Sequence, residues 1–238
     1  MDKKENTCLL RTVFRISLLM AGMAGSVMML FLLTLSVTGA GEQTAVPAFA
    51  PAELTLPVTV EGTHIQVLYL MAYEGPFLED GSMDEVVDAA ALVVRNTSAY
   101  DIEKAGITVK TADGTLVFSA EYIPAGERLM ILEQDRQLYT RQQPTQLSGW
   151  ERLCAEQGTA AIQITHEDMG TIRVTNTTDK ALFNIRFLHK NYLPESDIYI
   201  GGITYETKLD SLQPGESVHI QPEHYAAGYS KIFRIDAQ

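Results

Sequence analysis

Hydrophobic and polar residues follow two different patterns along the 238-residue chain. Residues 16–40, ISLLMAGMAGSVMMLFLLTLSVTGA, form one run of 25 residues without a charge. Beyond residue 57, apolar residues occur in short alternating or β-branched runs that Gly, Pro, Asn and Asp separate. A long uncharged run predicts a membrane-spanning helix, whereas short alternating runs between turn residues predict β-strands.

The uncharged run is long enough to cross a membrane. In a helix it covers about 37 Å, against a hydrocarbon layer of about 30 Å. The alternative is a secretory signal cleaved after SVTGA, but the apolar cores of such signals have only roughly 7–15 residues. Length therefore favours a retained transmembrane helix. Four Lys and Arg residues precede the run and none follows it before Arg95, which predicts a cytoplasmic stub at residues 1–15 and an exported C-terminal part.

Small residues recur along the predicted span, at Ser17, Ala21 and Gly25. A helix face of small residues lets two helices approach closely. The span is therefore compatible with helix-mediated self-association as well as with simple anchoring.

Residues 41–57 contain three prolines among small and polar residues and predict an extended linker. After it, Asp113-Gly114 predicts a tight hairpin turn. The predicted strands begin at His64, Ala91, Gly106, Thr115 and Glu127, and then at Ala160, Thr171, Leu182, Ile198, Glu216 and Tyr229.

The strand pattern contains an internal repeat. LVVRNTS (92–98) resembles IRVTNTT (172–178) at a shift of 80 residues, and IPAGERLMI (123–131) resembles LQPGESVHI (212–220) at a shift of 89. The second copy therefore has nine extra residues. They fall around NYLPESDIYIGG (191–202), where Gly201-Gly202 predicts a long loop or bulge.

A strand-rich repeat of this length fits a small β-sandwich. We expect one sandwich at residues 58–143 and a second at residues 159–238. Between them, Ser148 and Glu151 have capping-box spacing, so residues 144–158 predict a connecting helix that contains the chain's only tryptophan, Trp150.

The repeated Asn-Thr-Ser/Thr sequence has two interpretations. It matches the glycosylation sequon, and it also fits a turn in which the Asn side chain bonds the backbone where a strand ends. The turn explains both copies without a modification.

The order of these features resembles a known family. A strand, Asn-Thr-Ser/Thr, a second apolar strand and then AGE or PGE before a last strand resemble the small immunoglobulin-like bacterial domains of the FxLYD type. The resemblance implies a mainly β fold, with two tandem immunoglobulin-like antiparallel β-sandwiches after one N-terminal transmembrane helix. As a whole, the chain is similar to membrane-anchored surface proteins of Gram-positive bacteria. The family supplies no catalytic residues.

Charge restricts the partners of the exported part. The chain has a formal net charge of -12 and residues 1–40 contribute +2, which leaves -14 for residues 41–238. Such a charge disfavours nucleic acid and docking of the folded part on anionic lipid. The two cysteines, Cys8 and Cys154, are predicted on opposite sides of the membrane and cannot pair.

Few residues point to catalysis. Cys154 is a potential thiol nucleophile, and His219 with His224 is the only close histidine pair, but neither occurs in a known catalytic or metal-binding spacing. We therefore expect no enzyme activity, metal or cofactor. An envelope hydrolase or metal-dependent enzyme using these residues is the alternative hypothesis.

Tyrosines provide the sequence's best candidate for a binding surface, because aromatic side chains with a polar tip are favoured at interfaces. Five of the ten lie in the second copy: Tyr192, Tyr199, Tyr205, Tyr225 and Tyr229. The sequence thus predicts a non-catalytic binding or scaffolding protein of the bacterial cell envelope, with one membrane span, an extracytoplasmic C-terminal part and an envelope protein or cell-wall partner.

Overall fold

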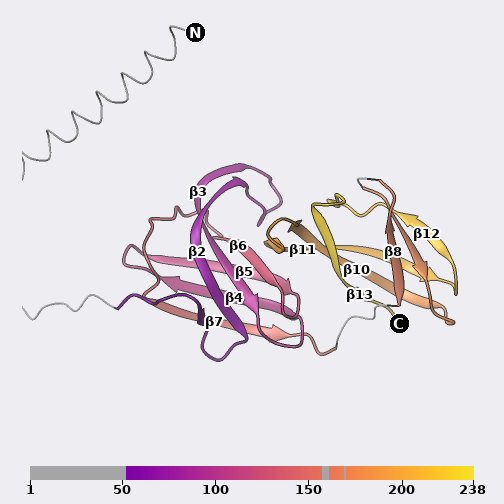
Figure 1. The fold of residues 1–238 in the computed structure, drawn as a ribbon, viewed down its shortest axis with the longest axis horizontal. Coiled ribbons are helices and arrows are strands. Elements are labelled where there is room, and N and C mark those ends of the chain that lie inside the picture. Colours follow the sequence, from indigo (N-terminus) through magenta and orange to yellow (C-terminus); the bar gives the residue numbers. More distant parts are fainter. Residues whose placement is uncertain (1–51, 157–160, 169) are drawn as a thin grey trace, which may run out of the picture. The chain divides into compact units, whose positions relative to one another are not determined.

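The computed structural model describes residues 52–156, 161–168 and 170–238, and these residues contain β-strands but no helix (Figure 1). Residues Ala50–Gln238 form one compact unit. The predicted cytoplasmic stub (1–15), the predicted span (16–40) and most of the predicted linker (41–57) lie outside the described residues. Within the described ranges, no helix is long and apolar enough to cross a membrane.

Thirteen strands occur in the described residues, and they include every strand that the alternating pattern predicts. The first half contains β1 (Val58–Thr59), β2 (Ile65–Pro76), β3 (Glu85–Asn96), β4 (Ile102–Lys110), β5 (Thr115–Ile123), β6 (Arg128–Leu132) and β7 (Gln146–Leu153). The second half contains β8 (Ile162–His166), β9 (Ile172–Asn176), β10 (Leu182–Leu193), β11 (Ile198–Leu212), β12 (Ser217–Ile220) and β13 (Ser230–Asp236).

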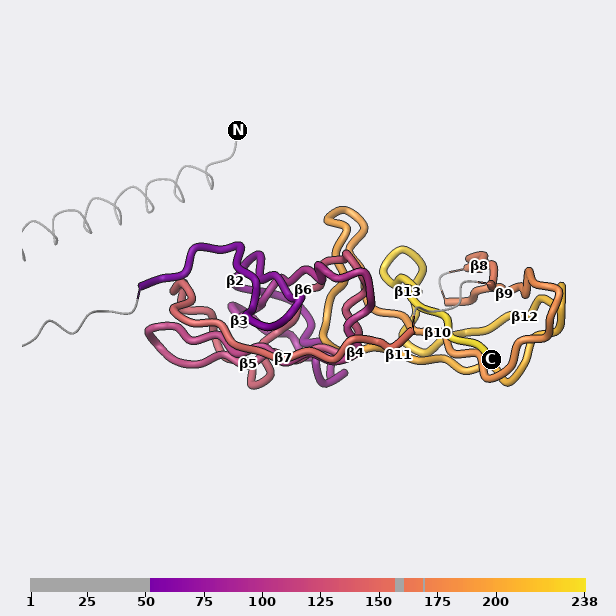
Figure 2. Tube along the Cα trace, turned by 90° about the horizontal axis from the view of Figure 1, so that it is seen from below, coloured from indigo at the N-terminus to yellow at the C-terminus, as the bar shows by residue number. Residues whose placement is uncertain are grey.

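The two halves have the same strand topology. In the first half β2-β3-β6 pair in one sheet and β5-β4-β7 in another, and in the second half β8-β9-β12 and β11-β10-β13 pair in the same order. Figure 2 shows β5, β7 and β4 along the lower edge of the first half, beneath β2 and β3. The sequence repeat therefore corresponds to a repeated six-stranded unit.

Each unit buries the inward-facing residues of its strands. From Ala105 onward in β4 and as far as Glu121 in β5 the alternation is regular, so that Ile107, Val109 and Phe118 are buried while their sequence neighbours face outward. Ile185, Phe187 and Leu212 occupy the corresponding core of the second half. Burial of such side chains supplies most of the stability of a sandwich.

The repeated Asn-Thr-Ser/Thr sequence forms the same buried turn twice. The Asn96 amide donates to Tyr100 O (2.8 Å) and Ile123 O (2.9 Å) and accepts from the Ser98 N–H and hydroxyl. Asn176 repeats this with Lys180 O, Leu212 O and Thr178. Both side chains are fully buried. Because all four hydrogen-bonding positions of each amide are occupied, the turn interpretation is confirmed.

The helix predicted at residues 144–158 is wrong, because Gln146–Leu153 form strand β7, which pairs with β4. β7 holds the position in the first half that β13 holds in the second. The Glu151 carboxylate does not cap a helix; it accepts the His64 N–H at 2.9 Å and lies 2.6 Å from His64 Nδ1. The capping-box spacing was therefore misleading, and Leu147 and Leu153 pack on the core from a strand.

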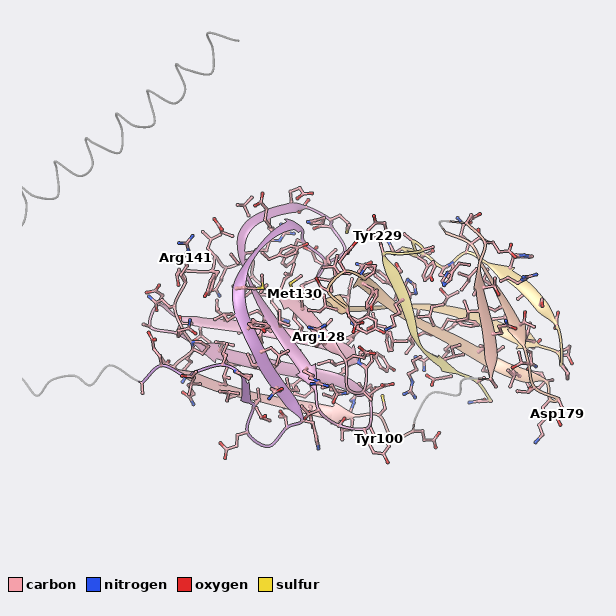
Figure 3. The ribbon with its side chains drawn as sticks, viewed as in Figure 1. Tyr100, Arg128, Met130, Arg141, Asp179 and Tyr229 are labelled. Carbon is pink, nitrogen blue, oxygen red and sulfur yellow. The ribbon has the colours of Figure 1, made fainter. Side chains whose placement is uncertain are left out.

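The nine-residue insertion joins the two halves in one sheet. β11 pairs in parallel with β6 through Tyr199 opposite Leu129 and Ile200 opposite Met130. This contact creates a seven-stranded sheet in the order β1-β2-β3-β6-β11-β10-β13. Arg128 strengthens the junction by donating to Ser196 O at 2.6 Å (Figure 3).

The core crosses the predicted boundary between the halves. Tyr199 comes from the second half, is 1% exposed and packs in the hydrophobic core of the first half. The sandwiches predicted at residues 58–143 and 159–238 are therefore not independent packing units, because a residue of the second completes the core of the first. The repeat identified equivalent strands, but it carried no information on which strand of the other copy the insertion would pair with.

Candidate functional site

A wide bulge interrupts the pairing of β10 with β11. His189 lies opposite Tyr205 and Asn191 lies opposite Ile200, so residues 201–204 face Lys190 alone. Gly201 has a φ of +86°, which favours glycine. The bulge predicted at Gly201-Gly202 is confirmed.

A buried ammonium group holds this bulge. Lys190 is fully buried, and its Nζ donates to Gly201 O (3.3 Å), Gly202 O (3.1 Å) and Ile203 O (2.6 Å). Three carbonyl acceptors match the three N–H donors of an ammonium, and they are the carbonyls that lack strand partners. Burial lowers the pKa of Lys190 to about 7, although nearby Glu79 acts in the opposite direction.

Glu79 fastens the other side of the bulge to the first half. Its Oε2 accepts the Gly202 N–H at 2.6 Å and its Oε1 accepts the Leu132 N–H at 2.8 Å. Burial raises the pKa of Glu79 to about 7, even though these N–H groups and Lys190 favour the carboxylate. Gly202 also lies against Ser119, because a Cβ at Gly202 would be 2.2 Å from Ser119 O.

A cleft of about 380 Å³ opens beside the bulge and is hereafter the Trp150 cleft. Its walls come from strands and loops of the first half and from the bulge of the second. Its lining residues are Phe77, Glu79, Asp80, Lys104, Ala105, Ser119, Ala120, Glu121, Gln134, Trp150, Gly202 and Ile203.

Trp150 is the most exposed large apolar group of this cleft, with 57% of its surface open to solvent. It stands on β7 directly opposite Gly106 of β4. A Cβ at Gly106 would lie 2.5 Å from Trp150 Nε1, so the indole lies over the space that the glycine leaves. The missing side chain thus seats the ring within the cleft.

Charges around the cleft are unevenly paired. The Lys104 Nζ lies 3.3 Å from Glu121 and the Arg136 guanidinium lies 2.6 Å from Asp80. Hydrogen bonds from Ser82, together with Arg136, lower the pKa of Asp80 to about 2. Within the described ranges, Glu79 is the one lining carboxylate without a cation at ion-pair distance.

The five tyrosines predicted as a binding surface are dispersed. Tyr199 and Tyr225 are buried, which corrects their assignment as surface contacts, and Tyr192 and Tyr205 are half-buried. The Tyr192 and Tyr199 rings lie 5.2 Å apart with Lys231 over both. Tyr229, with 63% of its surface exposed, is the only one that is mainly open (Figure 3).

The residues of the enzyme hypothesis occupy unrelated positions. His219 Nε2 lies 2.9 Å from Glu167, whereas the His224 ring stacks on Tyr205. Burial raises the pKa of the Cys154 thiol, the reverse of what a thiolate nucleophile requires. In the part of the chain that the structure describes, no group of three or more His, Cys, Asp or Glu side chains is placed to hold a metal.

The structure also contains an aromatic cluster around His189 that the sequence pattern does not predict. The His189 ring is fully buried, with the Tyr205 and Tyr225 rings at 5.2 and 5.3 Å. Burial lowers its pKa to about 4, against the effect of the Glu223 backbone. His189, Lys190 and Asn191 stand together between the apolar residues of FLHKNYL, and this polar interruption of a strand is the signal that the sequence offers.

Comparisons with known proteins add no assignment: no protein-family model, curated protein or solved structure matches this chain.

Proposed function

We propose that this chain is a non-catalytic binding protein of the bacterial cell envelope, anchored in the membrane by residues 16–40 and exposed on the outer side. Its binding site is the Trp150 cleft. We also propose that its two six-stranded units are immunoglobulin-like domains of the FxLYD type, and that their shared sheet serves to fix the cleft.

The observation that carries the proposal is the exposed indole of Trp150 inside a cleft to which both halves contribute. Indole rings are favoured in recognition sites, because they bury a large area and lose little conformational entropy on binding. The bulge wall is rigid, since Lys190 and Glu79 hold its backbone by hydrogen bonds. A preorganised wall lowers the entropic cost of binding.

Other features support binding in preference to catalysis. The thiol of Cys154 is held in its protonated form by burial, and His219 and His224 each have a separate partner. Tyr229 is a second proposed contact at the outer surface, because it is the mainly exposed member of the five tyrosines.

The proposal is tested by photo-crosslinking with the full chain on intact cells. A benzophenone amino acid replaces Trp150, and in a matched control it replaces Val87, which is 59% exposed and lies outside the cleft. We expect adducts at position 150 that are absent at position 87. Equal adducts at both positions, or none at position 150, would contradict a binding cleft.

A further inference from the structure

We propose that the Trp150 cleft binds an organic ammonium cation, that is, a primary or quaternary ammonium group on an aliphatic carbon. This inference rests on the proposed binding function and specifies its ligand class. The shape, the aromatic wall and the charges of the cleft each support it.

The aromatic wall attracts positive charge. The face of an indole carries negative electrostatic potential, and Trp is the side chain that binds cations most strongly in this way. Trp150 presents this ring with more than half of its surface open. Phe77, Ala105, Ala120 and Ile203 add apolar lining for the aliphatic carbons of such a ligand.

The charges of the cleft select a cation over an anion. Three carboxylates line it, those of Glu79, Asp80 and Glu121, against the single ammonium of Lys104. Arg136 and Lys104 pair with Asp80 and Glu121, so Glu79 is the lining carboxylate without a cation at ion-pair distance, and it is charged above its raised pKa of about 7. Each Glu79 oxygen accepts one N–H and keeps a free lone pair. Lys190 lies behind the bulge with its three donors engaged.

The size of the cleft favours an organic cation over a bare metal ion. A volume of about 380 Å³ accommodates several carbon atoms beside the charged group. Two of the three carboxylates are occupied by protein cations and thus are not free to form a compact oxygen cage.

Lys104 is a natural competitor of the ligand. Its Nζ lies 3.3 Å from Glu121, and both side chains are about half exposed. Replacing Lys104 should therefore tighten binding of a cation, whereas replacing Glu121 should weaken it. The affinity for a neutral ligand held by stacking alone would change in neither variant.

Trp150 makes the test direct, because it is the only tryptophan in the chain and its fluorescence reports on the cleft. The full chain, in a polyoxyethylene detergent that carries neither ammonium nor sugar, is titrated with choline, with n-butylamine, with 3,3-dimethylbutanol (the neutral isostere of choline) and with N-acetylglucosamine. We expect a saturable change with the two cations and none with the neutral compounds. The relative affinities of the two cations indicate whether the natural ligand is quaternary or primary.

Three variants make the electrostatic argument quantitative. Glu121→Gln should raise the Kd for choline about two- to fivefold and Lys104→Gln should lower it about two- to fivefold. Glu61→Gln removes an exposed carboxylate outside the cleft and should leave the Kd unchanged. A response to 3,3-dimethylbutanol equal to that of choline, no saturable response to either cation, or weaker binding in Lys104→Gln would overturn the inference. If the titration overturns the ligand class but photo-crosslinking still gives adducts at position 150, the cleft binds a partner that is not an organic ammonium cation.

Discussion

At the scale of single residues, the two buried asparagines show how a short sequence specifies a fold. Asn96 and Asn176 stand 80 residues apart, and each bonds one carbonyl four residues ahead and one on a distant strand end. Their role as turn residues was predictable, because Asn followed by Thr is a local signal. Their distant partners, Ile123 and Leu212, were not, because those bonds depend on the tertiary fold.

Asn176→Asp is predicted to destabilise the protein by about 2–4 kcal/mol, because it removes two N–H donors and places a carboxylate against the carbonyls of Lys180 and Leu212. Denaturant unfolding measures the loss. Asn184→Asp is the control: Asn184 is exposed and its amide donates only to Gln238, so the loss should stay below about 1 kcal/mol. Equal losses in the two variants would show that the hydrogen bonds of the buried Asn176 amide contribute no more to stability than that of the exposed Asn184 amide.

At the scale of elements, the sequence was informative about strands and uninformative about their partners. Alternating patterns located β2 to β6 and β8 to β13, whereas β7 was mistaken for a helix, since Ser148 and Glu151 imitate a cap. Gly201-Gly202 indicated the bulge. Its wall depends on Lys190 and on Glu79, which lies more than a hundred residues earlier, and no local pattern connects the two.

The bulge should make stability depend on pH. Glu79 has its pKa raised to about 7, so its stabilising contribution is complete below about pH 4.5 and is lost as pH rises through 7. Lys190 has its pKa lowered to about 7, so its contribution is complete above about pH 10.5 and is lost as pH falls through 7. The Glu79 contribution is lost above pH 7 and the Lys190 contribution is lost below it, so the sum of the two is smallest near pH 7.

The measurement is the difference in unfolding free energy between the wild type and the doubly substituted Glu79→Gln/Lys190→Met variant, which lacks both titrating groups. This difference should be least favourable to the wild type near pH 7 and should recover by roughly 1–3 kcal/mol toward acid and alkaline pH. A difference that stays constant with pH, or is greatest at neutrality, would contradict the pKa shifts of Glu79 and Lys190.

At the scale of the whole molecule, the repeat makes the two halves alike, whereas the insertion makes them different and joins them. The repeat builds two equivalent units, and the insertion gives the second unit a strand that completes the sheet of the first. The Trp150 cleft exists at this junction, because its walls come from both units. The candidate site could therefore not be predicted from the sequence. The sequence pattern predicted a connecting helix for Trp150 and a binding surface of five tyrosines, which the structure disperses.

The central claim is that the two halves form one cooperative body that holds the cleft. It is tested most directly by denaturant unfolding of the full chain with one tryptophan in each half: Trp150 for the first, and the Trp150→Phe/Phe183→Trp variant for the second, Phe183 being 49% exposed. We predict coincident midpoints, and we predict that Tyr199→Ala lowers both midpoints together, at a cost of about 3–5 kcal/mol. Two separate transitions, of which Tyr199→Ala shifts only one, would contradict the account.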